Sequence, residues 1–76
     1  MPRYFFDVHI GDAVEADAVG SELVSSAMII DMALDLCLQI ARERMPDSSN
    51  VGVHVRGMNG GAAVYQANIT LSGAWT

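Results

Sequence analysis

Apolar and polar side chains alternate along several stretches of the chain, and this period of two predicts β-strands with one buried face. The clearest stretch covers residues 3–10, where aromatic and β-branched side chains occupy every second position. Gly11-Asp12 follows and is typical of a two-residue hairpin turn, so residues 13–16 are expected to return as a short second strand. Further alternation predicts a third strand over residues 51–56 and a fourth over residues 63–71.

Between Ser26 and Arg44 the apolar residues recur instead with the spacing of an α-helix, which would be about 28 Å long at roughly 1.5 Å per residue. Ser25 is suited to cap its start, because its hydroxyl can accept a hydrogen bond from an otherwise unpaired amide. Arg42 and Arg44 suit the negative end of the helix dipole, and Pro46 requires the helix to end before it.

The remaining segments are expected to be connections. Residues 17–20 and 46–50 predict loops, and Asn59-Gly60 predicts a tight turn between the last two strands. Trp75, in the tail, is a candidate to fold back onto the core. We therefore expect one α+β domain of residues 1–76, a thin antiparallel sheet of three to four strands with one long helix packed on one face, in the order ββαββ.

The predicted helix is apolar around more of its circumference than a surface helix needs. One narrow stripe is polar and contains Asp31, Asp35, Gln39 and Arg42. The opposite side, which we expect to face the sheet, contains Ile29, Ile30, Ala33, Leu36, Cys37, Ile40 and Ala41. Two apolar flanks remain between these sides, one with Leu34, Leu38 and Met45 and the other with Met28 and Met32.

The flank of Leu34, Leu38 and Met45 has two interpretations. Loops and the Trp75 tail can cover it, or it is an interface where two copies of the chain associate, since contiguous exposed apolar patches usually mark interfaces. A chain of 76 residues buries a modest share of its surface, and association would extend its core. The default form of such an interface is a two-fold homodimer.

The charge balance excludes two classes of partner. Four arginines and no lysine stand against nine acidic residues, for a net charge of −5. Without a basic stripe to neutralise phosphates, the chain is not expected to bind nucleic acid or an anionic membrane surface. Cys37 is the only cysteine, so we expect neither an internal disulfide nor a structural zinc site.

The location of the protein is expected to be cytoplasmic. The first residues lack the basic and apolar regions of a signal peptide. The apolar run over residues 27–41 is short for a membrane-spanning helix, and it contains Asp31 and Asp35.

Four polar residues fall on one face of the predicted sheet, away from the helix: Asp7, His9, His54 and Arg56. Two histidines and a carboxylate form a common ligand set for transition metals. The alternative is that these are ordinary polar residues on the solvated face of an antiparallel sheet, because no metal-binding spacing is present. Cys37 lies on the apolar side of the helix and is expected to be a small core residue. With no catalytic arrangement in the sequence, neither an enzyme nor a cofactor is expected.

Three segments carry a resemblance to a known family: the opening Met-Pro-Arg-Tyr-Phe-Phe-Asp-Val-His, the Gly-Asp turn, and residues 17–23, Asp-Ala-Val-Gly-Ser-Glu-Leu. They resemble small uncharacterised bacterial proteins, common in rhizobia and related alphaproteobacteria, that open with Met-Pro-Arg-Tyr/Phe-Phe. The resemblance implies this fold and a bacterial cytoplasmic origin, without an established activity. The chain departs from these proteins in its helix, where they carry Arg and Glu near the positions of Ile30 and Met32.

Two functions fit these observations. The first is a small non-enzymatic protein that forms a homodimer and mediates protein–protein interaction. The second is a small-ligand or metal-binding module that uses the open face of the sheet.

Overall fold

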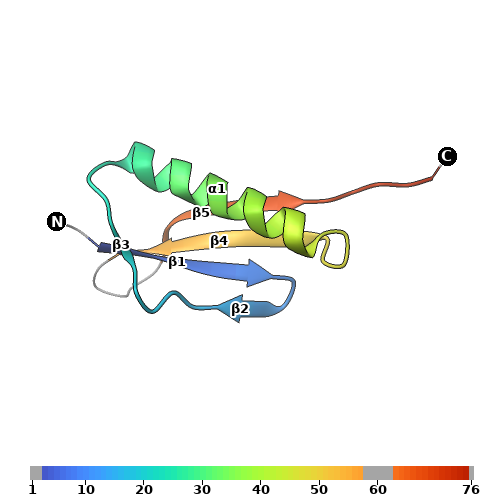
Figure 1. Ribbon diagram of the computed structural model, residues 1–76, viewed down its shortest axis with the longest axis horizontal. Coiled ribbons are helices and arrows are strands. Elements are labelled where there is room, and N and C mark those ends of the chain that lie inside the picture. Colours follow the sequence, from blue (N-terminus) through green and yellow to red (C-terminus); the bar gives the residue numbers. More distant parts are fainter. Residues whose placement is uncertain (1–2, 58–62, 76) are drawn as a thin grey trace.

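The computed structural model describes residues 3–57 and 63–75, and it confirms the α+β fold, an antiparallel sheet with one helix on one face (Figure 1). The elements in chain order are β1 (Arg3–Ile10), β2 (Ala13–Glu15), β3 (Ser21–Glu22), α1 (Ser26–Arg44), β4 (Asn50–Arg56) and β5 (Ala63–Thr70). The sheet has the order β2-β1-β4-β5, and β3 pairs with the other end of β1. All pairs are antiparallel. In this strand order β5 forms one edge of the sheet, and β2 and β3 together form the other.

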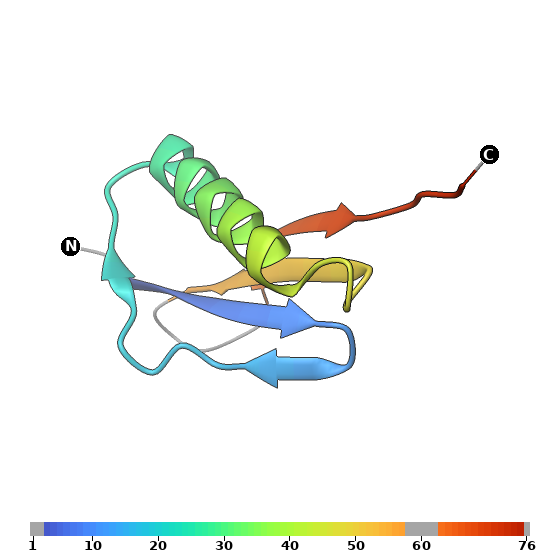
Figure 2. The same ribbon diagram turned by 45° about the vertical axis from the view of Figure 1, so that its right-hand side comes forward.

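The helix packs on β4 and β5 and leaves the other face of the sheet open (Figure 2). The buried apolar side chains come from β1, the segment before α1, α1 itself and β4: Phe6, Leu23, Ile29, Ala33, Cys37, Val51, Val53 and Val55. The helix residues at the centre of this core, Ala33 and Cys37, are small, which lets α1 approach the valine-rich face of β4 closely.

The ends of α1 agree with the sequence prediction. The Ser25 hydroxyl accepts a hydrogen bond from the amide of Met28 and caps the first turn. Arg42 and Arg44 lie in the last turn, where their charge complements the helix dipole.

The predicted hairpin between the first two strands is confirmed. Gly11 has a φ of +58°, a left-handed conformation that glycine adopts without strain, and β2 returns along Val8 to Ile10 of β1. The predicted turn at Asn59-Gly60 lies outside the described residues.

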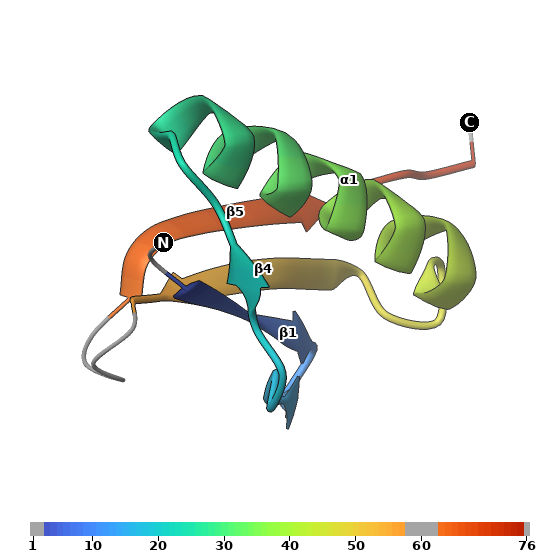
Figure 3. The ribbon, with the colours of Figure 1, turned by 60° about the vertical axis from the view of Figure 1, so that its left-hand side comes forward.

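The two-residue strand β3 was not predicted from the sequence. After β2 the chain runs along the edge of β1, and Ser21 and Glu22 pair with Tyr4 and Arg3 before the chain rises to α1 (Figure 3). The element order is therefore βββαββ. Two residues are too few for an alternating pattern, and this strand depends on contacts with β1 that are distant in sequence.

Two expectations about the helix surroundings are wrong. Ile30 is not buried against the sheet but is 45% exposed, because about 100° of rotation per residue turns it away from Ile29 and aligns it with Leu34. Trp75 does not fold back onto the core, since it is fully exposed and the tail leads away from the helix (Figure 1). The Trp75 tail therefore leaves the flank uncovered.

Candidate functional site

The strand register gathers the four predicted polar residues on the face of the sheet opposite α1. Asp7 of β1 lies opposite His54 of β4, and Arg56 lies opposite Phe5. The imidazole rings of His9 and His54 stack with their centroids 3.7 Å apart and their planes 24° from parallel. The sequence therefore placed these residues on the correct face, and the structure shows how they are paired.

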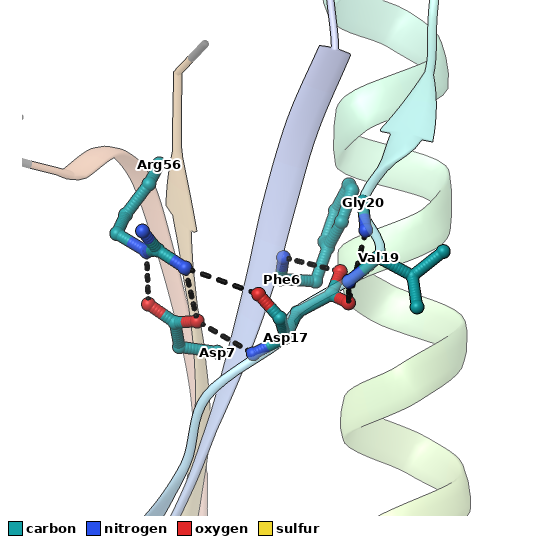
Figure 4. Close-up of polar contacts among 6 residues, drawn as sticks. All are labelled: Phe6, Asp7, Asp17, Val19, Gly20 and Arg56. Atoms are coloured by element: carbon teal, nitrogen blue, oxygen red, sulfur yellow. Dashed lines mark hydrogen bonds and ion pairs between the residues drawn. The ribbon is translucent and has the colours of Figure 1, made fainter. Parts of the chain in front are cut away.

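Asp7 and Arg56 form a bidentate ion pair (Figure 4). The Arg56 Nε atom lies 2.5 Å from Asp7 Oδ2, and a terminal guanidinium nitrogen lies 3.1 Å from Oδ1. The guanidinium carbon also lies 5.0 Å from the centre of the Phe5 ring. The hydrogen bond from Arg56 lowers the pKa of the Asp7 carboxyl below its usual value despite burial, and the same bond raises the pKa of Arg56.

Asp17 connects this ion pair to the edge of β1 (Figure 4). Its amide donates a hydrogen bond to Asp7 Oδ1 at 2.9 Å, and its carbonyl oxygen accepts one from Arg56 at 3.2 Å. Its carboxylate accepts hydrogen bonds from three amides: those of Phe6, Val19 and Gly20. Burial raises the pKa of Asp17, but these amides outweigh it, and the pKa lies below its usual value.

The carboxylate of Asp17 accepts a backbone hydrogen bond of β1 at a position where no described edge strand pairs with β1. β2 pairs with β1 only over Val8 to Ile10, and β3 pairs only with Arg3 and Tyr4. The amide of Phe6 lies between these two pairings, and Asp17 Oδ2 accepts its hydrogen bond at 3.2 Å. A partly buried amide therefore has a partner where the edge strand is interrupted.

The rest of segment 17–23 also has structural roles. Gly20 has a φ of +78°, and a Cβ atom there would lie 2.9 Å from side-chain atoms of both Arg3 and Phe5. Arg3 donates to the carbonyl oxygen of Val19 at 2.7 Å and forms an ion pair with Glu22 at 3.3 Å. We call the contacts of Asp17 and Gly20 with β1, together with the Asp7–Arg56 pair, the edge latch.

The edge latch limits what the open face can bind. Both oxygens of Asp7 contact Arg56, so its carboxylate is not free to join His9 and His54 as a metal ligand. Within residues 3–57 and 63–75, no three histidine, cysteine or acidic side chains are placed to hold one metal ion. Cys37 is 1% exposed, and burial raises the pKa of its thiol, which disfavours the nucleophilic thiolate.

The flank of α1 is a second candidate site. Ile30, Leu34 and Leu38 are 45%, 50% and 49% exposed, and at a spacing of four residues they form one stripe along the helix. Met45, the third residue predicted for this interface, is half-buried at the end of the helix. We call Ile30, Leu34 and Leu38 the apolar stripe.

The apolar stripe lies on the side of α1 that faces β5. A hollow of about 270 Å³ opens between the first half of the helix and β5, and Ile30, Val64 and Tyr65 are among the residues that line it. The other flank, with Met32 and Leu36, lies over β1 and the segment after β2. The apolar stripe therefore adjoins the edge strand β5 at Ile30, and Leu34 and Leu38 continue the stripe along the same side of the helix.

The chain after β4 carries a signal that the sequence analysis missed. Residues 57–76 contain no charged side chain, although the whole chain has a net charge of −5. This span includes β5, whose side chains on the open face are exposed: Val64, Gln66, Asn68 and Thr70. The sequence alone shows that one whole predicted strand lacks charge. It does not show that this strand, β5, lies at an edge of the sheet.

Residues 3–70 match the family described as Domain of unknown function (DUF6894). The chain belongs to this family. The match begins at the first residue of β1 and ends at the last residue of β5, so the DUF6894 domain corresponds to the whole fold. No curated protein and no solved structure matches the chain.

The DUF6894 domain of this chain contains both candidate sites, and Leu71 to Trp75 follow it. Among the described residues, no helix has the length and apolarity that crossing a membrane requires. The family description names no activity.

Proposed function

We propose that this protein is a small non-enzymatic cytoplasmic protein that forms a homodimer through the apolar stripe of α1 and mediates protein–protein interaction. The observation that carries this proposal is the exposure of Ile30, Leu34 and Leu38, each about half accessible on a helix that packs on the sheet with its other side. Fully burying an exposed side chain of this kind contributes on the order of 1.5–3 kcal/mol, and about half of that remains to be gained at each of these positions, so the stripe favours association.

The size of the domain supports the same proposal. A chain of 76 residues buries about 60% of the surface of its unfolded state, and Cys37, its only cysteine, cannot form an internal disulfide. Oligomerisation is one of the common ways in which small domains gain further buried surface. A dimer would bury leucine and isoleucine side chains that the single chain leaves in water.

The charges on the helix permit two stripes to meet. Asp31 and Asp35 are exposed and lie beside Met28 and Met32, on the flank of α1 away from β5. Two acidic chains can therefore dock through their apolar stripes without placing these carboxylates opposite one another.

The stacked histidines support a second candidate, a module that binds a small ligand or metal on the open face. His9 and His54 are half-buried there, and neither is part of the edge latch. A thermal-shift scan with zinc, nickel and manganese tests this candidate, using a His9→Ala, His54→Ala double variant as the control. A rise in melting temperature that the double variant lacks would support it, and no rise for the wild type would contradict it.

Sedimentation equilibrium over a range of micromolar concentrations tests the proposed homodimer. We expect twice the chain mass for the wild type and the monomer mass for folded Leu38→Arg, because a buried unpaired charge is costly at an apolar interface. Gln39→Arg is the matched control, one residue away on the polar side, and should remain dimeric. A wild type that stays monomeric throughout contradicts the proposal.

A further inference from the structure

We propose that the second copy pairs with the free edge of β5 in antiparallel orientation, on a two-fold axis at Ala67, so that one sheet continues through both chains and the two apolar stripes meet above it. This inference rests on the proposed self-association and adds its geometry. The occupant is a second copy of this chain.

The backbone of β5 offers hydrogen-bonding groups at its outer edge. The amide of Leu71 donates to the carbonyl oxygen of Ser49 at 2.8 Å, so position 71 points toward the β4 side. Backbone groups of an antiparallel strand alternate between its two sides. The groups of Gln66, Asn68 and Thr70 therefore point outward, where no described strand pairs with them.

From Tyr65 to Thr70 the edge carries none of the features that normally prevent strand pairing, since the register irregularity of β5 lies before Tyr65, at Val64. Natural edge strands are protected by charge, proline, bulges or a short length. β5 has eight residues, and it contains neither a charged residue nor a proline. A partner recognised through its charge would have no charged side chain of β5 to pair with. Two copies of this acidic chain can bring their β5 strands together without placing like-charged β5 side chains opposite one another.

The sequence of β5 is complementary to itself in one antiparallel register. With Ala67 opposite Ala67 of the second copy, Tyr65 lies opposite Ile69 on the helix side of the sheet. An aromatic and a β-branched residue form a favourable cross-strand pair. On the open face the same register places Gln66 opposite Asn68, two amides that can exchange hydrogen bonds. The small side chain at the axis suits the close approach of a non-hydrogen-bonded pair.

The position of α1 fits the same axis. The Cys37 sulfur lies 3.6 Å from the carbonyl oxygen of Ala67, so Leu34 and Leu38, on the neighbouring turn positions, lie level with the proposed axis. Strands are spaced about 4.8 Å apart, and α1 packs on both β4 and β5. The axis of helix α1 would then lie about one strand spacing from the two-fold axis. The α1 helices of the two copies would therefore lie about 10 Å apart. This matches the distance at which helices pack.

Cysteine cross-linking tests the register. Across a non-hydrogen-bonded pair the two Cα atoms lie about 4.5 Å apart, within reach of a disulfide. Ala67→Cys should therefore form a covalent dimer on mild oxidation. Thr70→Cys is the matched control, because Thr70 lies away from the axis and the same residue of the second copy is about 20 Å away along the strand. Both variants carry Cys37→Ala, since Cys37 is close to position 67 and would compete for the new thiol.

Gln66→Pro tests the edge itself. Proline removes one outward amide and no hydrogen bond to β4, so this variant should give a monomer with the wild-type circular dichroism spectrum. A dimeric Gln66→Pro protein contradicts pairing through β5. Cross-linking does not depend on this variant, so the inference can be tested even if Gln66→Pro fails to fold.

The outcomes separate the inference from the proposed function. A monomeric wild type removes both. A dimeric Cys37→Ala protein in which Ala67→Cys fails to cross-link, or in which Thr70→Cys cross-links equally well, overturns the β5 register and leaves self-association in place. A dimer that cross-links at position 67 and not at position 70 supports the inference.

Discussion

The two edges of the sheet are built in opposite ways. At the β1 edge, β2 and β3 are three and two residues long, Glu15 and Glu22 add charge, and the carboxylate of Asp17 accepts the hydrogen bond of Phe6 between them. At the β5 edge, eight uncharged residues run beside a helix whose apolar stripe is half exposed. One edge is closed within the chain, and the other has no partner among the described residues.

The polar residues of this domain serve mainly to close the β1 edge. Asp7, Asp17 and Arg56 are a chemically rich group, but their hydrogen bonds are directed at one another and at the backbone. They stabilise the fold and close an edge against unwanted pairing. The β5 edge and the apolar stripe are uncharged and have no partner among the described residues, so substitutions at the two edges should have different consequences.

The largest effect is expected at Gly20. Gly20→Val should lower the free energy of unfolding by about 3 kcal/mol, because a β-branched residue is strained at positive φ and its side chain meets Arg3 and Phe5. Urea denaturation measures the change. Gly73→Val is the control, since a Cβ atom there contacts nothing within 4 Å, and its stability should be close to that of the wild type. Equal loss in both variants would contradict the role of Gly20 in the edge latch.

Removal of the Asp17 carboxylate should have the next largest effect. Asp17→Ala leaves the amide of Phe6 without its partner and should lower the free energy of unfolding by about 2 kcal/mol. Asp35→Ala, on the polar side of α1, should change it by less than about 0.5 kcal/mol. If the two variants are equally stable in urea, Asp17 does not close this edge.

Acid should weaken the closed edge. The pKa values of Asp7 and Asp17 lie below the usual value of 3.8 in the folded chain, so both carboxylates stabilise the fold above that pH. This stabilisation should be lost as the pH falls below about 4 and protons bind. Urea midpoints measured at intervals between neutral and acid pH should fall less steeply for Asp17→Asn than for the wild type. An identical pH dependence would contradict the assignment.

The smallest effect on folding, and the sharpest test of the open edge, is expected for Gln66→Lys. The side chain is exposed, so the free energy of unfolding of the monomer should change by less than about 0.5 kcal/mol. In the proposed register the two lysines would lie near each other across the axis, and dimerisation should weaken. Sedimentation in low and high salt checks this, because salt screens the repulsion and should restore part of the dimer. Unchanged dimerisation in low salt would contradict the register.

Local signals were sufficient to predict most of the fold. The alternation in β1, β4 and β5, the Gly11-Asp12 turn and the Ser25 cap each depend on neighbouring residues, and all appear in the structure. β3 and the bonds of Asp17 were missed because they join residues that are distant in sequence. Ile30 was assigned to the wrong side because the small residues Ala33 and Cys37 set the centre of the buried arc.

The candidate sites were predicted less completely than the fold. Leu34 and Leu38 were identified from the width of the apolar arc, and the structure shows that they are exposed. The open-face group was also placed on the correct face, but Arg56 was not expected to occupy both oxygens of Asp7. Which edge of the sheet stays open depends on the order of the strands, and the local patterns of a single sequence do not indicate that order.

Amide hydrogen exchange along β5, followed by NMR at increasing protein concentration, is a direct test of whether a second copy pairs with this strand. Exchange at Tyr65, Ala67 and Ile69 should be slow throughout, because these amides face β4. We predict that exchange at Gln66, Asn68 and Thr70 is fast in dilute protein and slows as concentration rises, since a second copy would cover the outer edge. Fast exchange at these three amides at every concentration would rule out pairing through β5.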